Sequence, residues 1–237
     1  MEDVIKKIPV FRIRAFNAVK DPESCEKFLK GHARVLESIG VNKVTSSTHE
    51  WVDNPDVYVF IAEDIETNEV YGGGRIHVIN EQFPLPIQTA VSELDPCVNT
   101  HVMKMHKEKR AGELCGLWNS RKVAGLGLGA VFLARAGLAI LSQIKVGALY
   151  SLCASYTVQM GLNLGFHIVP ELGKDGTFYY PKLDLLATVL LQDSTYKLEE
   201  AIEEERQCVL ALRNTPNCLR TEYYRKRTLK IQYQLQL

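Results

Sequence analysis

One stretch of the chain combines a carboxylate with a glycine-rich turn. The segment 112–119, GELCGLWN, is typical of a buried strand, and Gly125, Gly127 and Gly129 follow it, directly before a long apolar run. Glycine inside a helix costs about 1 kcal/mol relative to alanine, so this cluster indicates a backbone that something approaches closely or that adopts a positive φ. A strand, a glycine-rich turn and a helix N-terminus form an anion-binding arrangement, because free N–H groups and the helix dipole both face the anion.

Two common phosphate-binding motifs do not fit this stretch. GxxxxGK followed by Ser or Thr is absent, and GxGxxG is absent because GLGLGAVFLARAG has its next glycine too late. A Rossmann fold would also begin with the glycine-bearing strand, whereas this strand lies in mid-chain. Close packing of small residues between a helix and a sheet is the alternative explanation of the glycines.

Charge and composition limit the class of protein. Lys plus Arg and Asp plus Glu each number 28 among 237 residues, and 46% of the residues are hydrophobic. This balance is typical of a globular protein and argues against bulk electrostatic capture of nucleic acid or of an anionic membrane. The basic segments 104–110 and 220–230 are therefore interpreted as solvated faces, and we expect no nucleic-acid partner.

The chain shows no signal for export or for crossing a membrane. The N-terminal segment lacks the apolar core of a signal peptide, and Arg135 interrupts the longest apolar stretch, 130–140, which is too short for a bilayer. The six cysteines are scattered without a CxxC pair, which predicts a cytoplasmic protein with reduced thiols. His101 and His106 have no acidic or thiol companion at ligand spacing, so no metal site is expected.

Apolar periodicity and turn signals predict a mixed α/β fold. One large domain is expected, with a core over 1–192, a mainly irregular insertion over 81–110, and a C-terminal helix and strand over 193–237 that pack on the core. The strands are expected at 8–17, 56–64, 70–80, 112–119, 147–155, 166–173, 183–193 and 228–237. The helices are expected at 21–40, 98–109, about 121–143, 156–165 and 194–214.

The stretch RKVAGLGLGAVFLARAGLAIL resembles the acyl-CoA-binding segment of the GNAT N-acyltransferase superfamily. That pattern is Gln or Arg, two residues, Gly, one residue, then Gly or Ala; Lys122, Gly125 and Gly127 occupy these positions, with lysine in the first. The hairpin at 56–80 and the LGF at 164–166 follow the family's order, so the resemblance covers about residues 8–192. It implies a twisted, mostly antiparallel central sheet flanked by helices, with backbone amides around the pyrophosphate of coenzyme A.

A narrower similarity is to acyl-homoserine-lactone synthases and N-acyl amino acid synthases. Arg75 lies where these relatives have an Arg-Leu pair, and Glu113 lies where they begin a Glu-x-Ser-Arg motif on the next strand. Gly116 stands where the synthase pattern has arginine, so the similarity is compatible with a long-chain acyl donor but does not support lactone formation.

The resemblance implies transfer of an acyl group from acetyl-CoA, a longer acyl-CoA or an acyl carrier protein to a primary amine of a small molecule or an amino acid. Direct attack by the amine needs a base, an oxyanion donor and an acid for the leaving thiolate. Glu113 is the expected base, the alternative being a solvated strand-end carboxylate. Gly161 replaces the family's acidic tyrosine, so Tyr156 is expected to substitute, with Ser155 or a merely structural tyrosine as alternatives.

The remaining site residues follow from the same similarity. Alternation along a strand predicts that Glu113 shares a face with Cys115, Leu117 and Asn119. Arg75 and His77 are expected at the acceptor pocket, although a buried histidine is the simpler explanation of His77. The residues expected to bind acyl-CoA are Leu117, Trp118, Asn119, Lys122, Val123, Ala124, Gly125, Leu126, Gly127 and Leu128.

The two extensions bear on donor length and assembly. The insertion carries many apolar residues, which predicts a hydrophobic cleft beside the strands at 70–80 and 112–119 and a preference for medium or long acyl groups over acetyl. The alternating tail at 228–237 is expected either to wall a tunnel, to extend the sheet or to form an edge for a homodimer contact. The alternative function is a catalytically silent acyl-CoA-binding or interaction module.

Overall fold

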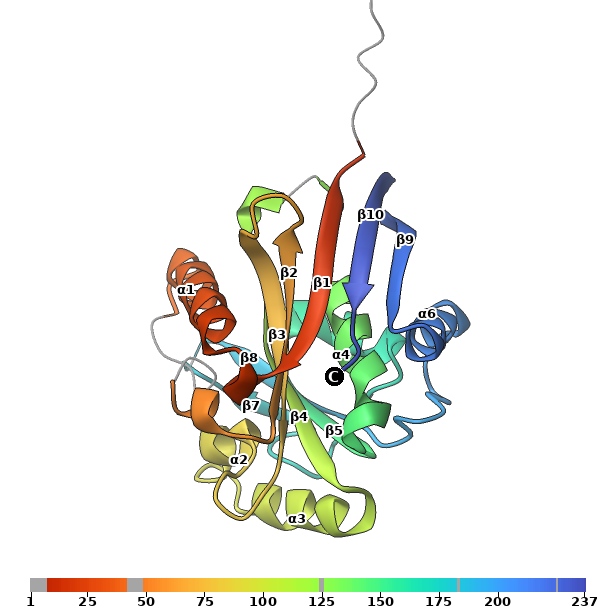
Figure 1. The fold of residues 1–237 in the computed structure, drawn as a ribbon. Coiled ribbons are helices and arrows are strands. Elements are labelled where there is room, and N and C mark those ends of the chain that lie inside the picture. The colour runs from red at the N-terminus through yellow and green to blue at the C-terminus, as the bar shows by residue number, and fades with distance from the viewer. Residues whose placement is uncertain (1–7, 42–48, 124–125, 183, 225) are drawn as a thin grey trace, which may run out of the picture.

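The computed structural model describes residues 8–41, 49–123, 126–182, 184–224 and 226–237 (Figure 1). Ala124 and Gly125 of the expected phosphate loop lie outside these residues. The strands are β1 (Val10–Asn17), β2 (Val57–Asp64), β3 (Val70–Val78), β4 (Ala111–Asn119), β5 (Ala148–Ala154), β6 (His167–Ile168), β7 (Thr177–Tyr179), β8 (Leu186–Gln192), β9 (Asn217–Tyr224) and β10 (Arg227–Gln234). The α-helices are α1 (Pro22–Ser38), α2 (Pro86–Val91), α3 (Cys97–Lys109), α4 (Ala130–Ile144), α5 (Val158–Asn163) and α6 (Glu203–Asn214).

The strands described form one mixed, mostly antiparallel sheet. Its order is β6-β8-β5-β4-β3-β2-β1-β10-β9, with β7 paired to β8 outside this path. Only the β4–β5 and β1–β10 pairs of the described strands are parallel. The expected fold class, an α/β fold with a mostly antiparallel sheet flanked by helices, is confirmed.

Helices cover both faces of the sheet (Figure 1). Helix α4 packs on one face, where its apolar side chains join those of β1 to β4, α5 and α6 in the largest core cluster. Helix α1 packs on the opposite face around Phe28, and α2 and α3 cover the same face at the other end of β4. This layering buries β4 and β5 on both faces and brings two helical layers to the point where these strands separate.

Local signals explain where the predicted elements form. The Asp21 side chain caps α1 by accepting a hydrogen bond from Ser24 N, and Pro22 occupies the first turn, as expected of a helix start. The turn of the β2–β3 hairpin is closed by Asp64, whose carboxylate accepts hydrogen bonds from the backbone of Glu66 and Thr67.

Three expectations about the elements are wrong. The insertion is mainly helical, because α2 and α3 bury its apolar residues in a core of their own, and Leu85 and Ile87 are fully buried there. The helix expected from 194 begins only at Glu203, after turns in which Leu198 adopts a φ of 54°. The strand expected at 166–173 spans only β6, and the turn segment after it contains β7.

The C-terminal tail takes one of the three arrangements left open from the sequence, the extension of the sheet. Strand β10 pairs with β1 on one side and with β9 on the other, so the tail extends the sheet as an inner strand. The edge strand on this side of the sheet is β9, which overlaps the segment 220–230 interpreted as a basic solvated face. Alternation did place Leu229, Ile231 and Tyr233 on one buried face of β10, and Leu235, directly after the strand, is buried as well.

Arg135, the charge within the apolar run, joins this extension to α4. Its guanidinium donates two hydrogen bonds to the Glu205 carboxylate, at 2.6 and 2.8 Å, and lies 3.9 Å from Glu222. Tyr233 donates a further hydrogen bond to Glu222. All of these side chains are buried or nearly so, which makes the network an internal connection between α4, α6 and the β9–β10 hairpin.

Within the described residues, no helix has the length and apolar character needed to cross a membrane.

Candidate functional site

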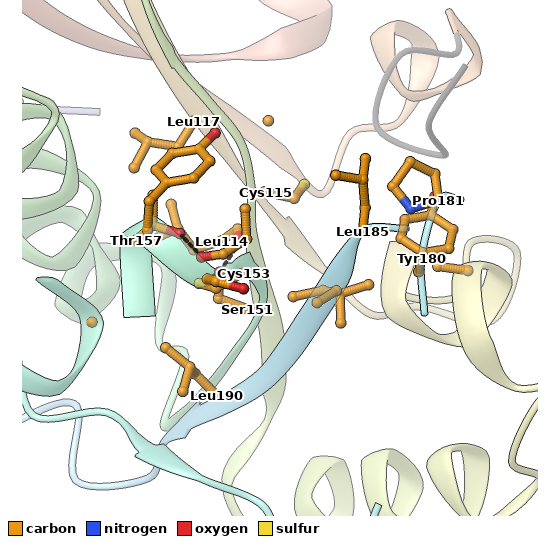
Figure 2. A pocket seen from close by; sticks show the side chains of 18 of the residues that line it. Leu114, Cys115, Leu117, Ser151, Cys153, Thr157, Tyr180, Pro181, Leu185 and Leu190 are labelled. Carbon is orange, nitrogen blue, oxygen red and sulfur yellow. Dashed lines mark hydrogen bonds between the residues drawn. The ribbon is translucent and has the colours of Figure 1, made fainter. Parts of the chain in front are cut away.

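Strands β4 and β5 separate after a short paired segment. They pair only where 111–113 of β4 meets 148–150 of β5. Beyond this point, the Ser151 hydroxyl donates a hydrogen bond to the Leu114 carbonyl at 2.9 Å and bridges the widening gap. A cavity of about 600 Å³ opens there, a volume typical of small-molecule sites. Figure 2 shows Leu114, Ser151 and Cys153 at its centre.

The cavity is lined from both faces of the sheet. The helical layer of α4 and α5 contributes Ala134, Met160, Gly161 and Leu164, and Leu190 of β8 lies with them. The opposite layer contributes side chains from α1, α2 and the β7–β8 connection, and Figure 2 shows Tyr180, Pro181 and Leu185 on this side. The residues of this second group are His32, Leu36, Ile39, Val41, Pro86, Ala90, Tyr180, Pro181, Asp184 and Leu185. The cavity therefore extends through the sheet where β4 and β5 part.

A bulge in β4 interrupts its alternation. Arg75 of β3 pairs with Cys115 and Gly73 pairs with Trp118, so two residues of β4 oppose Gly74. Gly116 takes a φ of 60° at this bulge, a conformation that favours glycine. A Cβ at Gly116 would also lie 3.2 Å from Arg75 Nη1, so glycine leaves room for the Arg75 guanidinium beside the bulge.

The bulge moves side chains to the other face, so the expected grouping of four β4 residues on one face is wrong. Glu113 and Cys115 face the layer of α1 and α2, where Glu113 contacts α2. Leu117 packs with the α4 core, and Asn119 donates a hydrogen bond to Leu128 before α4. One extra residue in a strand reverses every later position.

Glu113 is a buried carboxylate on the cavity wall, so it is not a solvated strand-end residue. It is 2% exposed, and one oxygen accepts a hydrogen bond of 2.6 Å from Ile87 N at the start of α2. Burial raises the pKa of Glu113 to about 8, while the Ile87 hydrogen bond and the positive charge of Arg75 act in the opposite direction. A carboxylate tuned close to neutral pH is suited to accepting a proton.

Arg75 and His77 lie behind this wall, outside the set of residues that line the cavity. Arg75 is fully buried, donates a hydrogen bond of 2.8 Å to His77 Nε2, and stacks 4.5 Å from the Trp51 ring. Burial lowers the pKa of Arg75 but a guanidinium remains charged, and burial with this charge lowers the pKa of His77. The pair therefore places a fixed positive charge beneath Glu113 and Cys115.

The two cavity cysteines are poor candidates for an acyl-enzyme nucleophile. Burial raises the pKa of Cys115 to about 12, although Arg75 acts against this shift. Burial also raises the pKa of Cys153, whose sulfur lies 3.3 Å from the Ser151 hydroxyl. Both residues are thiols at neutral pH, and the thiolate is the reactive form.

Tyr156 lies on the cavity wall at the 3₁₀ turn Ser155–Thr157, but its side chain is 82% exposed. Gly161, at the position of the family's tyrosine, is buried on α5. A methyl group there would lie 2.5 Å from Leu190 Cδ1, so Leu190 fills the space that a larger side chain would need. The family's acidic tyrosine therefore has neither a side chain nor space at Gly161, and Tyr156 lies at the rim of the cavity.

The expected acyl-CoA residues are divided by the structure. Leu117 borders the cavity, whereas the Trp118 ring packs against Gly31 of α1. Lys122 Nζ is 2.6 Å from Glu69 in an exposed ion pair. Val123 and Leu128 are buried, and Leu126 is partly exposed.

Part of the glycine cluster contacts the C-terminal hairpin. Gly127 has a φ of 95°, and a methyl group on it would lie 2.9 Å from Arg227 Cβ. A methyl group on Gly129 would lie 2.6 Å from the Tyr224 ring. Close packing, one of the two explanations weighed from the sequence, therefore applies at both positions, and the positive φ of Gly127 gives a second reason for glycine there. Phosphate binding by this loop stays a prediction.

His32 was missed from the sequence. It lies on α1, is 5% exposed and borders the cavity beside the bulge. Helical periodicity placed it on the apolar face of α1, but periodicity does not show that this face meets a cavity.

The sheet order, the two helical layers and the opening between β4 and β5 define the class: this chain has the fold of the GNAT acyltransferases. FeeM, an N-acyl amino acid synthase from uncultured soil microbes, is similar with a TM-score of 0.64 at 14% identity, over 83% of this chain and 97% of FeeM. The CoA-dependent acyl-homoserine lactone synthase BjaI has a TM-score of 0.54 at 12% identity, over 86% of this chain and 90% of BjaI. MesI, another CoA-dependent acyl-homoserine lactone synthase, has a TM-score of 0.51 at 15% identity, over 87% of this chain and 97% of MesI.

No protein-family profile matches the sequence, and no curated protein matches it. The likeness to solved structures therefore establishes the fold, and the activity is argued from the site.

Proposed function

We propose that this protein is an N-acyltransferase. It moves an acyl group from acyl-CoA, or from an acyl carrier protein, to the primary amine of a small molecule or an amino acid. The observation that carries the proposal is Glu113, a buried carboxylate with a pKa near 8 on the wall of a cavity between two separating strands. The named activities of FeeM and BjaI, which are N-acyl amino acid and acyl-homoserine lactone synthesis, are of the same type.

The donor is expected to enter from the face of α4 and α5. Within the part of the chain that the structure describes, the side of β4 turned toward β5 has no strand partner over 117–119, so its backbone groups can pair with the pantetheine arm as a strand would. The bulge at Gly116 frees a backbone position in the ladder, which suits it to bind the developing oxyanion. We expect the backbone of 123–128 to hold the phosphates.

The acceptor is expected to enter from the face of α1 and α2, toward which Glu113 points. The amine nitrogen attacks the thioester carbonyl, Glu113 takes a proton from the nitrogen, the C–N bond forms and the C–S bond breaks. The leaving thiolate then takes a proton, for which Tyr156 at the rim is the candidate donor. This sequence forms no acyl-enzyme, in agreement with the raised pKa values of Cys115 and Cys153.

The cavity lining favours a medium or long acyl group. Most of the lining side chains are apolar, but the insertion contributes only Pro86 and Ala90 to them. The cleft expected beside β3 lies instead between β4 and β5. Each methylene buried is worth about 0.8 kcal/mol, or about fourfold in affinity.

Thiol release tests the function directly. The protein is mixed with acetyl-, octanoyl- or palmitoyl-CoA and a panel of amines and amino acids, and free thiol is measured with a chromogenic disulfide. We expect amine-dependent release that is faster with octanoyl-CoA than with acetyl-CoA. A rate that is highest with acetyl-CoA would contradict the long-chain donor and leave an acetyltransferase.

The alternative is a catalytically silent acyl-CoA-binding module. It is favoured by Gly161 and by Leu190, which occupies the space of the family's acid. Binding of acyl-CoA in a thermal-shift assay without thiol release from any amine would support this alternative and exclude the enzyme.

A further inference from the structure

His32 is a buried polar side chain on the acceptor side of the cavity. Its residue is 5% exposed, and its Nδ1 is buried with no hydrogen-bond partner among the described residues. Buried polar atoms are nearly always paired, so an unpaired one beside a cavity needs an explanation. The neighbouring side chains on this wall, Leu36 of α1 and Ile39 directly after α1, are apolar.

The position of His32 fits a group that belongs to the acceptor. A methyl group on Gly116 would lie 3.8 Å from His32 Cε1, so the ring is beside the bulge where the thioester is expected. Glu113 and His32 border the same half of the cavity, on the face of α1 and α2. An amine that reaches Glu113 therefore brings its remaining substituents into the space next to His32.

Arg75 is the charged group that shifts the pKa of His32, and its positive charge favours an anionic ligand, whereas the exposed Asp184 carboxylate on the same side of the cavity acts against one. Burial and the positive charge of Arg75 lower the pKa of His32 to about 4, so the ring is neutral at pH 7 and one nitrogen carries a proton to donate. Arg75 remains charged beneath the wall, whereas Glu113, with a pKa of about 8, is largely protonated. A carboxylate in this half of the cavity gains from the Arg75 field and from the His32 N–H.

We propose that His32 is a positioning and specificity residue that donates a hydrogen bond to the carboxylate of an amino acid acceptor. This inference rests on the proposed acyl transfer and narrows its acceptor class from amines in general to amines that carry a carboxylate.

Matched acceptors test the assignment. L-Leucine and isoamylamine differ by the carboxylate alone, as do L-phenylalanine and phenethylamine. Wild type, His32→Leu and His32→Gln are compared with octanoyl-CoA as donor, and leucine binding is also measured by calorimetry, which needs no turnover. Arg34→Leu, on the exposed side of α1, is the matched control.

His32→Leu is expected to raise the KM for leucine by about 10-fold to about 100-fold, the loss typical of a hydrogen bond to a charged group, and to leave kcat nearly unchanged. The KM for isoamylamine is expected to stay the same, and His32→Gln to keep most of the leucine affinity because its amide still donates. Arg34→Leu is expected to behave as wild type.

Equal losses for leucine and isoamylamine would overturn the assignment and make His32 a packing residue. Absence of thiol release with every amine in wild type would overturn the proposed function instead, and calorimetry then decides about His32. Leucine binding that is lost in His32→Leu supports the assignment. Unchanged leucine binding in the variant, or no leucine binding by wild type, overturns it.

Discussion

Glu113 illustrates how one residue takes its chemistry from its surroundings. A glutamate in water is ionised at neutral pH. At this position α2 and β4 exclude water from the carboxyl group, and burial raises its pKa to about 8. The single hydrogen bond from Ile87 N orients the carboxylate without cancelling the effect of burial. The residue is therefore neutral when resting and becomes a base at mildly alkaline pH.

The rate of transfer is expected to follow this ionisation. In wild type, kcat/KM for the amine rises with pH up to about 8, because only the ionised carboxylate accepts a proton. Glu113→Gln is expected to lower turnover by about 10²-fold to 10⁴-fold while acyl-CoA affinity stays the same. Dividing the kcat/KM profile of wild type by that of Glu113→Gln cancels the ionisation of the amine, which affects both proteins equally. If this ratio shows no inflection near pH 8, Glu113 is not the base.

Stability should depend on the same proton, with a defined sign. The folded pKa of about 8 lies above the ordinary value of 4.5, so between these values the folded state holds a proton that the unfolded state has released. The free energy of unfolding of wild type is therefore expected to fall, relative to that of Glu113→Gln, as pH rises from 4.5 to about 8. Above pH 8 the difference between the two proteins is expected to stay constant. Urea unfolding of both proteins at several pH values measures this difference; parallel curves throughout would contradict the raised pKa.

At the scale of elements, the turn before α4 and the β9–β10 hairpin depend on each other. Gly129 has an ordinary extended backbone at the N-terminus of α4, so alanine there is excluded by contact and not by strain. The contact is the Tyr224 ring, which also packs edge-on against Phe132 at 5.8 Å. The hairpin therefore fixes the entry to α4, where the phosphates of the donor are expected.

A double-mutant cycle tests this contact. Gly129→Ala is expected to destabilise the protein by about 1–3 kcal/mol, the usual cost of overpacking. In the background of Tyr224→Ala the same change is expected to cost much less, because the ring is gone. The measurement is urea unfolding of the two single variants and the double variant. Additive effects would show that Tyr224 does not cause the glycine requirement.

At the scale of the whole molecule, the C-terminal extension is part of the same sheet and is held by a buried charge network. Arg135 reaches from α4 to Glu205 on α6 and toward Glu222 on β9. Removal of one member leaves the others charged and buried, which is typically far more costly than losing the attraction itself.

Arg135→Met is expected to lower the free energy of unfolding by about 3–5 kcal/mol. The double variant Arg135→Met/Glu205→Leu is expected to recover much of this loss, since it removes the most closely paired carboxylate together with its partner. Exposed Lys197→Met, which breaks a surface ion pair with Glu199, serves as the control and is expected to cost less than about 1 kcal/mol. An equal loss in the single and double variants would mean that Arg135 contributes by packing alone.

Local patterns in the sequence determined most of the elements. Alternation identified the buried face of β10, capping and proline signals identified the start of α1, and the polar turn between two apolar runs identified the β2–β3 hairpin. These features depend on neighbours along the chain, so the sequence contains their cause. The polar edge strand β9 was missed because its exposed alternate residues resemble a solvated face.

The tertiary structure alone decided what the site is made of. A single bulge at Gly116 turned Leu117 and Asn119 away from Glu113, and no periodic rule anticipates an inserted residue. The pKa of Glu113 depends on α2, which the sequence placed in an irregular insertion, and the exposure of His32 to the cavity depends on where β4 and β5 part. The sequence identified Glu113 as the candidate base, but only distant packing determines which groups surround it and hence its charge.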